Sequence, residues 1–355
     1  MKKLQFAMVG GGNGALIGDI HRIGAQFDDL AELKAGCFSR HWDKNLEAGE
    51  KWGVEPGRIY PDYHTMLEEE AKRTGEDRLD FVVVATPNNT HYEIVKDIIA
   101  HGFHIVCDKP VTFTSRESEE LKALAQEKDL LFGVSYSYAH YAILEQAKKM
   151  IADGVLGKIH TIAAEYPQEW VGLNTALRGK DGLTWRVDPA ICGPSGVIAD
   201  IGTHVEYLIS KVTGLKPVRV LARLRSIPDY VPVESDAQVL IDYDNGAAGI
   251  FWTSFAMVGK SCCMKVRIYG DKGGMEWNAH DFMELRVDIA GQPTQIWSAN
   301  YDYCDPQARK SCRLPKGMPE AFHSLFANLY RGYCSHLLSR KEGKDERPLD
   351  RKSVV

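Results

Sequence analysis

The stretch VGGGNGALIGDIH, residues 9–21, decides the fold of this chain. It follows an apolar run at 4–10 that predicts a buried β-strand, and it leads into residues with a helical pattern. Glycines at such a turn let backbone N–H groups approach a pyrophosphate, whose charge the helix N-terminus favours. We predict that Gly18 packs the helix and that the following turn residues bind a dinucleotide: Gly10, Gly12, Asn13, Gly14 and Ala15.

Outward from this turn, short apolar runs alternate with amphipathic stretches as far as about residue 135. Near-continuous apolar strands that alternate with helices predict a parallel sheet covered on both faces. The runs after the first are AELKAGCFS (31–39), LDFVVVATP (79–87), FHIVCDKP (103–110) and LLFGVS (130–135). Polar residues and turn residues end each run, so binding residues are expected at the carboxyl edge of the sheet.

Beyond residue 136 the pattern changes to two-residue alternation, which predicts antiparallel strands. The examples are VRVLARLR (218–225), AQVLIDY (237–243) and MKVRIYG (264–270), with Asn245-Gly246 as a hairpin turn. Helical stretches are expected at 200–213 and 319–338. We therefore predict an α/β domain over 1–135 and an α+β domain with a large, mainly antiparallel open sheet over 136–355.

Composition excludes several classes of protein. The formal net charge of −5 comes without a long run of one sign, which gives no reason to expect nucleic acid or an anionic membrane as partner. No segment approaches the roughly 18 apolar residues of a membrane span, and the first apolar run is too short for an export signal. The 8 cysteines form no C-x-x-C pair or zinc pattern; we expect thiols buried in strands, such as Cys37, Cys107 and Cys263, in a cytoplasmic protein without metal.

The end of the second predicted strand bears on the choice of dinucleotide. A carboxylate for the adenosine ribose is expected about 20 residues after the glycine turn, but Ser39 and Arg40 stand there. A hydroxyl and a guanidinium suit the 2′-phosphate of NADP. Arg40 stacked on the adenine of NAD is an equal alternative, so the sequence favours NADP only slightly.

Three further motifs accompany the glycine turn: ATPNNTHYEIV (85–95), CDKP (107–110) and GPSGVIADIGTHVEYL (193–208). Together and in this order they resemble the family of glucose–fructose oxidoreductase, inositol dehydrogenase and MocA, over residues 4 to about 338. The resemblance implies a Rossmann domain that binds NAD or NADP, and hydride transfer to or from a secondary alcohol of a sugar, glycoside or inositol.

The resemblance assigns the catalytic positions to Lys109, Asp200 and His204. Oxidation of an alcohol needs a base for the hydroxyl proton, and a histidine suits that task near neutral pH. The lysine supplies charge beside the developing alkoxide. Asp200 and His204, four residues apart, are expected on one helix face, where the carboxylate holds a substrate hydroxyl or orients the imidazole. The family triplet is Glu-Lys-Pro, whereas this chain has Asp108, which puts the carboxylate's role in doubt; a cis Lys109–Pro110 bond is expected.

The remaining expected site residues also come from the resemblance. His91 either hydrogen-bonds the cofactor or only begins a helix. Besides the residues of the glycine turn with Ser39 and Arg40, those expected at the cofactor are Thr86, Pro87, Asn88, His91, Asp108, Lys109, Trp185 and Arg186. Those expected at the substrate are Lys109, Tyr138, His140, Tyr166, Asp200 and His204, with Tyr141 and Trp170 as further aromatic candidates that are as often core residues.

Two other functions remain open at this point. One is an NAD-dependent glycosidase that oxidises its substrate transiently and recycles the cofactor; the other is a cofactor-binding regulator without activity. Retention of Lys109, Asp200 and His204 argues against the regulator. The Arg and apolar residues of the second sheet, by family habit, suggest a homodimer or homotetramer through that sheet. The sequence ends at PLDRKSVV (348–355), where the resemblance implies a further helix and strand.

Overall fold

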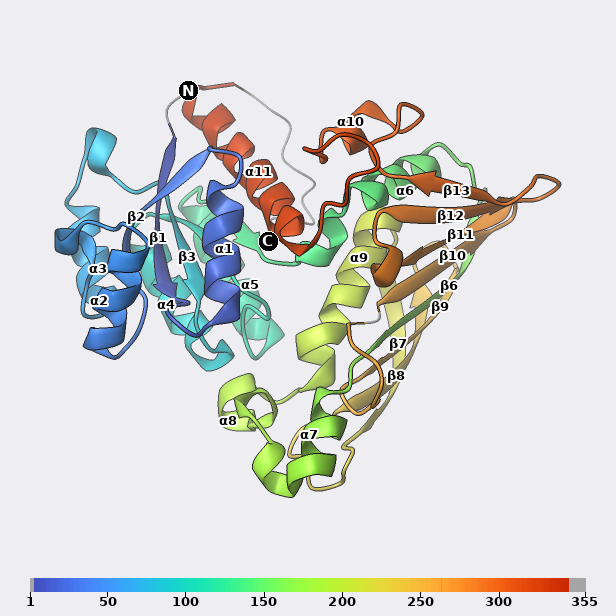
Figure 1. The fold of residues 1–355 in the computed structure, drawn as a ribbon, viewed down its shortest axis with the longest axis horizontal. Helices are drawn as coiled ribbons and strands as arrows, with labels where there is room; N and C mark the ends of the chain where they lie inside the picture. Colours follow the sequence, from blue (N-terminus) through green and yellow to red (C-terminus); the bar gives the residue numbers. More distant parts are fainter. Residues whose placement is uncertain (1–2, 263, 345–355) are drawn as a thin grey trace. The chain divides into compact units, whose positions relative to one another are not determined.

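The fold, seen in a computed structural model, is described for residues 3–262 and 264–344 (Figure 1). The chain divides into two compact units: unit 1 comprises Met1–Ser137 and the chain from Phe322, and unit 2 comprises Tyr138–Ala321. The stretch PLDRKSVV and the expected burial of Cys263 lie outside the described residues. Within those residues, no helix has the length and apolar character needed to cross a membrane.

Unit 1 contains a five-stranded sheet in the order β2-β1-β3-β4-β5, and every strand pair in it is parallel. This confirms the predicted α/β fold. Its strands are β1 (Leu4–Gly10), β2 (Ala31–Cys37), β3 (Phe81–Ala85), β4 (His104–Cys107) and β5 (Phe132–Val134). Its helices are α1 (Leu16–Gln26), α2 (Trp42–Lys51), α3 (Tyr63–Ala71), α4 (His91–Ala100), α5 (Ser115–Glu127) and α11 (Phe322–Lys341).

Two apolar cores lie on the two faces of this sheet, because successive residues of a strand point to opposite sides. Phe6 and Met8 of β1 join one core, together with side chains of α1 and α11. Ala7 and Val9 join the other, together with side chains of α3, α4 and α5. The five residues of β3 are buried throughout, which is why this strand reads as an uninterrupted apolar run.

Helix α11 differs from the domain division expected from the sequence, which placed every residue beyond 135 in the second domain. The structure groups this helix with unit 1. Phe326, Tyr330 and Tyr333 are buried in the core that also contains α1, and Arg331 forms an ion pair with Asp28 at 2.7 Å between Nη2 and Oδ1. Packing between segments some 300 residues apart decides this placement. The local sequence pattern does not predict such long-range packing.

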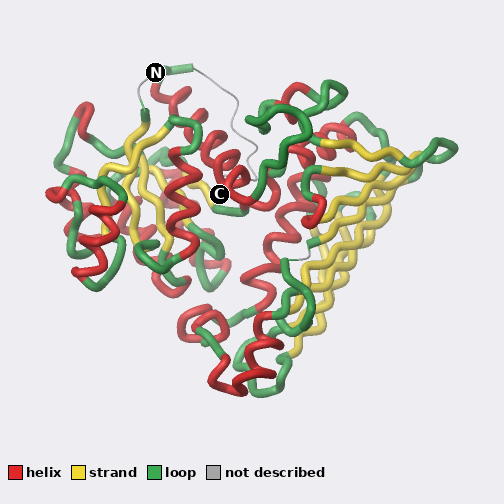
Figure 2. Tube along the Cα trace, in the orientation of Figure 1, coloured by secondary structure: helices red, strands yellow, loops and turns green. Residues whose placement is uncertain are grey.

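Unit 2 contains an eight-stranded sheet in the order β13-β12-β11-β10-β6-β9-β8-β7, drawn as the large group of yellow strands in Figure 2. Only the β6–β9 pair is parallel, so the predicted mainly antiparallel sheet is confirmed. Its strands are β6 (Ile159–Pro167), β7 (Pro217–Arg225), β8 (Asp236–Tyr243), β9 (Ala248–Ser254), β10 (Lys265–Gly270), β11 (Gly273–Asn278), β12 (Glu284–Ile289) and β13 (Gln295–Ser298). Its helices are α6 (Ala142–Ala152), α7 (Trp170–Arg178), α8 (Pro189–Cys192), α9 (Thr203–Thr213) and α10 (Pro306–Arg309).

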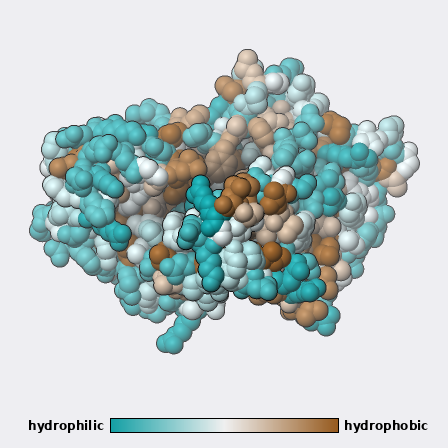
Figure 3. Space-filling model, turned by 60° about the horizontal axis from the view of Figure 1, so that its bottom comes forward, coloured by the Kyte–Doolittle hydropathy of each residue, from teal (hydrophilic) through white to brown (hydrophobic). Residues whose placement is uncertain are grey.

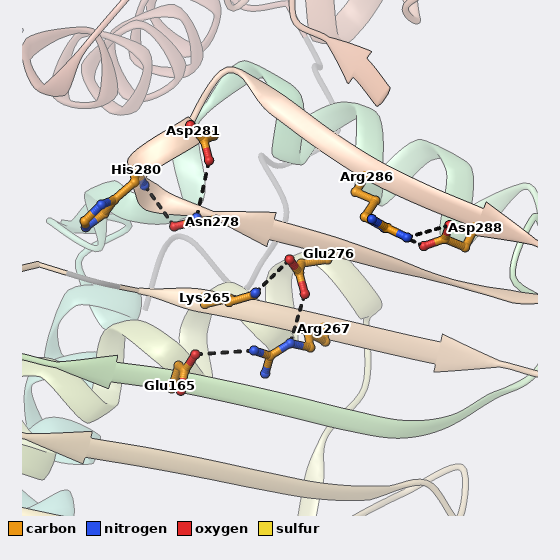
Figure 4. A network of polar contacts seen from close by, with 9 residues as sticks. All are labelled: Glu165, Lys265, Arg267, Glu276, Asn278, His280, Asp281, Arg286 and Asp288. Carbon is orange, nitrogen blue, oxygen red and sulfur yellow. Dashed lines mark hydrogen bonds and ion pairs between the residues drawn. The ribbon is translucent and has the colours of Figure 1, made fainter. Parts of the chain in front are cut away.

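One face of this sheet carries a row of charged side chains across β6, β10 and β11 (Figure 4). Arg267 donates to Glu276 at 2.9 Å and approaches Glu165 at 3.4 Å, while Lys265 lies 2.7 Å from the other oxygen of Glu276. Burial alone raises the pKa of Glu276, but the two cations outweigh it and hold that pKa below its ordinary value. This part of the face is polar and internally paired.

The same face becomes apolar toward β7. Leu221, Leu240 and Ile250 are register partners on β7, β8 and β9, and their exposed fractions are 69%, 51% and 51%. On the opposite side of β7, Val218 and Val220 are also more than half exposed. The alternating pattern of β7 predicts the strand correctly. Because β7 is an edge strand, neither of its sides is buried within unit 2.

Candidate active site

The glycine turn between β1 and α1 crosses the end of β2 at close range. The N–H of Gly12 donates to the carbonyl oxygen of Phe38 at 3.0 Å, and a Cβ on Gly12 would lie 2.7 Å from that oxygen. Only glycine permits this approach. No side chain caps α1 at Ala15, and nothing lies within 4 Å of a Cβ built on Gly14. The helix therefore begins without a side-chain cap, which fits a helix N-terminus that binds the pyrophosphate of a dinucleotide.

Gly18, in α1, lies directly against the turn. A Cβ at this position would stand 1.8 Å from the carbonyl oxygen of Gly11 and 2.3 Å from its Cα. The obstacle is backbone, which a rotamer change does not relieve. The contact confirms that Gly18 is a packing residue, at which the helix lies against the turn.

We expect Gly18→Ala to lower the free energy of unfolding by at least about 1–3 kcal/mol, the usual cost of overpacking. Dinucleotide binding is expected to weaken as well, because α1 must move away from the turn. Chemical denaturation and cofactor fluorescence titration measure the two effects. Gly57→Ala is the control, since nothing lies within 4 Å of its Cβ position. Equal stability of the two variants would contradict the prediction.

The predicted adenosine end carries the cation Arg40, and no Asp or Glu directly follows β2 in sequence. Ser39 and Arg40 follow β2, and the side chain of Arg40 is exposed. The Ser39 hydroxyl oxygen accepts a hydrogen bond from the N–H of His41 at 3.1 Å. Lys51 of α2 donates to Asn13 of the glycine turn at 3.4 Å. Sequence analysis missed Lys51, because only the fold brings α2 to the turn.

The turn after β3 lies beside the glycine turn. A Cβ on Gly10 would approach the methyl group of Thr86 to 2.6 Å. The Thr90 hydroxyl lies 2.7 Å from the hydroxyl oxygen of Thr86 and 2.8 Å from the carbonyl oxygen of Pro87. Asn88 begins the short 3₁₀ segment Asn88–Thr90. The predicted Thr86-Pro87-Asn88 stretch is therefore a compact turn at the carboxyl edge of the sheet.

His91 is the first residue of α4, and its side chain is fully buried. Its Nδ1 lies 2.8 Å from the carbonyl oxygen of Pro110, and its Nε2 lies 2.9 Å from that of Thr86. Both ring nitrogens are used within unit 1, which leaves neither for a hydrogen bond to the cofactor. The Lys109–Pro110 peptide bond is cis, as the sequence resemblance implied.

Lys109 follows β4, and Asp108 fixes its backbone. The N–H of Lys109 donates to Asp108 Oδ1 at 2.9 Å, and the Ser135 hydroxyl donates to the same oxygen. His21 Nε2 lies 3.8 Å from this carboxylate, while its Nδ1 lies 2.7 Å from the hydroxyl of Tyr330. Burial by itself raises the pKa of Asp108, but the hydrogen bonds and charges of its neighbours, led by His21, hold that pKa well below its usual range. Asp108 is thus an ionised side chain that positions Lys109.

Asp200 and His204 lie in unit 2, but not within one α-helix as expected. Asp200 belongs to the π-helix Ile198–Gly202, and His204 belongs to α9. π-Helical turns occur often at functional sites. Glu234 holds the start of this segment by accepting three hydrogen bonds, from Ser195 Oγ at 2.6 Å, Gly196 N at 2.9 Å and Ile198 N at 3.2 Å. Sequence analysis missed Glu234, because nothing in its local sequence marks a contact 36 to 39 residues away.

Two tyrosines accompany His204 in unit 2. The ring of Tyr138 meets the imidazole edge-on, with centroids 4.9 Å apart, and the Tyr166 hydroxyl donates to the Tyr138 hydroxyl at 2.8 Å. Burial raises the pKa of both hydroxyls, so both groups remain protonated. The structure therefore brings together three of the residues predicted at the substrate.

His140 and Tyr141 have other neighbours. Lys211, buried in α9, donates to His140 Nδ1 at 3.2 Å and lies 3.0 Å from a carboxylate oxygen of Glu145. Burial, aided by the charge of Lys211, lowers the pKa of His140 well below its ordinary value, so the imidazole is neutral and accepts this bond. Tyr141 stacks on Phe282 with centroids 5.3 Å apart, as a core residue does. These contacts give both residues structural roles in unit 2.

Trp185 and Arg186 belong to the short 3₁₀ segment Trp185–Val187 of unit 2. The guanidinium carbon of Arg186 stands 4.8 Å from the centroid of the Trp185 ring, a cation–π contact. Figure 3 brings the α7–α8 edge forward and shows brown hydrophobic residues within a mostly hydrophilic surface. Leu177 and Val258 are exposed by 72% and 62% in this part of unit 2. Trp170 instead packs on Phe255 at 4.6 Å between centroids, which is a core contact.

Metal ligands do not gather anywhere in the described parts of the chain, where no group of three or more His, Cys, Asp and Glu residues is placed to hold an ion. Among the cysteines of those parts, Cys37 and Cys107 are buried free thiols, as expected, whereas Cys262 is exposed.

Two family models match this chain. Residues 4–136 match an oxidoreductase family with an NAD-binding Rossmann fold, and residues 144–276 match the GFO/IDH/MocA C-terminal domain. The uncharacterized oxidoreductase YfiI of Bacillus subtilis (strain 168) is 36% identical over 352 residues, which cover 98% of this chain and 89% of that protein.

Solved structures are also similar to this chain. An inositol dehydrogenase homolog from Azotobacter vinelandii, in complex with NAD+, has a TM-score of 0.91 at 35% identity, with 96% of this chain and 88% of that chain covered. The same homolog in complex with NADH and myo-inositol has a TM-score of 0.89 at 34% identity, with the same coverage.

Proposed function

The chain belongs to the Gfo/Idh/MocA family of NAD(P)-dependent oxidoreductases, and on that premise we propose that it moves a hydride between the nicotinamide and a secondary alcohol or ketone of a sugar, glycoside or inositol. The observation that carries the proposal is the position of Lys109. It follows β4, separated only by β3 from the strand that ends in the glycine turn. Its backbone is held by an ionised carboxylate. The Azotobacter vinelandii homolog, solved with NADH and myo-inositol, supports the substrate class.

In the proposed mechanism each side chain has a separate task. The turn amides and Arg40 hold the dinucleotide, whose nicotinamide accepts or returns the hydride when bound. His204 takes the proton of the substrate hydroxyl. Lys109 donates a hydrogen bond to the oxygen as negative charge develops on it. Asp200 holds a neighbouring hydroxyl or orients the imidazole.

Tyr138 and Tyr166 extend the proposed substrate surface around His204. Their protonated hydroxyls both donate and accept hydrogen bonds, as polyol recognition requires. Trp185 and Arg186 are proposed to contact the cofactor. We further propose that the protein works in the cytoplasm, where free thiols such as Cys107 stay reduced.

A panel of polyols and sugars, run with NAD and with NADP, tests the proposal. Net formation of reduced nicotinamide, followed by absorbance, is the expected result with at least one polyol. Product without net absorbance change would indicate the transient oxidation of an NAD-dependent glycosidase instead. Reaction of aliphatic amino acids in place of polyols would overturn the substrate class.

We expect Arg40→Ala to raise the KM for NADP by about tenfold or more, because a hydrogen bond to a charged group contributes about 1.5–3 kcal/mol. The KM for NAD is expected to change little. Initial rates with both cofactors measure the ratio. Arg116→Ala, on α5, is the control. An equal rise in the KM for NAD and for NADP would show that the guanidinium contacts the adenine and not a 2′-phosphate.

We propose that the protein forms a homodimer or homotetramer through the sheet of unit 2. The row of Leu221, Leu240 and Ile250 supports this, since three aliphatic side chains, each at least half exposed, lie side by side on one face. The paired charges of Glu165, Arg267 and Glu276 give the remainder of that face a polar border. A self-complementary face of this kind suits a two-fold interface.

A further inference from the structure

His91 occupies an unusual position for a histidine. Its side chain is fully buried in unit 1, between the turn after β3 and the turn after β4. Nδ1 lies 2.8 Å from the carbonyl oxygen of Pro110, and Nε2 lies 2.9 Å from the carbonyl oxygen of Thr86. One ring therefore bridges two turns that both carry residues predicted at the cofactor.

The chemistry of the partners fixes the charge of the ring. A backbone carbonyl oxygen only accepts hydrogen bonds, and a neutral imidazole carries one N–H. In a neutral ring, one bare nitrogen would face an oxygen lone pair at hydrogen-bonding distance. Only the imidazolium form has an N–H at both nitrogens and satisfies both carbonyls.

We propose that His91 is an imidazolium ion that ties the Thr86 turn to the Lys109–Pro110 turn, and that it acts as a positioning residue for Lys109. The N-terminus of α4 opposes a cation at this place. Against that, two hydrogen bonds from a charged donor are each roughly twice as strong as neutral ones. Burial of the charge also opposes the imidazolium, and the proposal requires that the two charge-assisted bonds offset both costs.

Each of the two turns also has a hydrogen bond of its own. The Thr90 hydroxyl lies against Thr86, and Asp108 accepts from the N–H of Lys109. The imidazole of His91 bonds to both turns at once. Loss of one of its two bonds lets the turns separate, and Lys109 shifts with its turn.

The protonation state is tested without reference to activity. Neutron diffraction from crystals of the deuterated full chain, at the pH used for activity measurements, shows which ring nitrogens carry deuterium. We expect deuterium on both Nδ1 and Nε2 of His91. Deuterium on one nitrogen only would overturn the proposal, whether or not a substrate has been found.

The consequence for turnover rests on the proposed function. The amide of Gln in His91→Gln donates to one carbonyl and presents an oxygen to the other, so one bridge is lost. We expect kcat to fall on the order of 10–100-fold, because catalysis is sensitive to misplacements of about 1 Å. The Kd of the cofactor and the KM of the polyol are expected to change far less. An unchanged kcat in the folded variant would overturn the positioning role.

His101→Gln is the matched control. His101 ends the same helix, and its Nδ1 lies 2.8 Å from Asp97 O, within its own turn. We expect wild-type kcat for this variant. If the wild-type protein turns over no sugar or polyol, the proposed function fails while the neutron result still decides the charge of His91. The two failures are therefore separate.

Discussion

Replacement of Lys109 by Met is expected to lower kcat on the order of 10²–10³-fold, the usual loss when one preorganised donor to a developing oxyanion is removed. Methionine keeps the length of the side chain and removes its charge. The Asp108 carboxylate and the backbone N–H of residue 109 remain, so the turn is expected to keep its shape. Initial rates with the best substrate of the polyol panel give kcat, and fluorescence titration gives the Kd of the reduced cofactor.

The Kd of the reduced cofactor is expected to change only a few-fold, because Lys109 acts on the substrate oxygen. A loss of kcat with a nearly unchanged Kd then reports the catalytic role of the lysine. Lys122→Met on α5 removes an exposed lysine that pairs with Glu119 at 3.5 Å, and it is expected to leave kcat unchanged. Wild-type turnover by the Lys109→Met protein would remove the lysine from the mechanism.

Replacement of His204 by Ala is expected to lower kcat by roughly 10²–10⁴-fold, the range that general acid–base catalysis contributes. The side chain is only 6% exposed and lies edge-on against Tyr138, so its removal leaves a small space beside that ring. Added imidazole is expected to restore part of the rate by entering this space. A histidine with a purely structural role would give no such rescue.

His160→Ala is the control for this variant. His160 lies exposed on β6, and its Nδ1 approaches the hydroxyl of Thr161 at 2.9 Å. We expect normal kcat and no effect of imidazole. Retention of at least a tenth of the wild-type kcat by the His204→Ala protein would exclude the imidazole as the principal base.

Much of the fold was predictable because its signals are local. The strands of the parallel sheet are short apolar runs that end in turn residues, and those of the second sheet show two-residue alternation. The glycine turn was predictable because a close approach of two backbone segments requires glycine, as at Gly12 and Gly18. The resemblance in motif order then located Lys109 and His204.

The supporting contacts of the site carry no comparable signal. His21 and Tyr330 are 309 residues apart in sequence and meet behind Asp108. Glu234 reaches back to the π-helix that contains Asp200. Any residue with a suitable donor or acceptor would fit such a contact, so spacing along the chain does not select it.

The sequence by itself determined the two sheets of this protein, the glycine turn after β1 and the side chains proposed to act in catalysis. Only the tertiary structure decided that α11 completes unit 1, that Asp108 is an ionised support for Lys109, and that both nitrogens of His91 are engaged. The physical reason is the distance along the chain over which each signal acts. Periodicity and turn chemistry act over a few residues, whereas burial and charge state depend on every group that packing brings near.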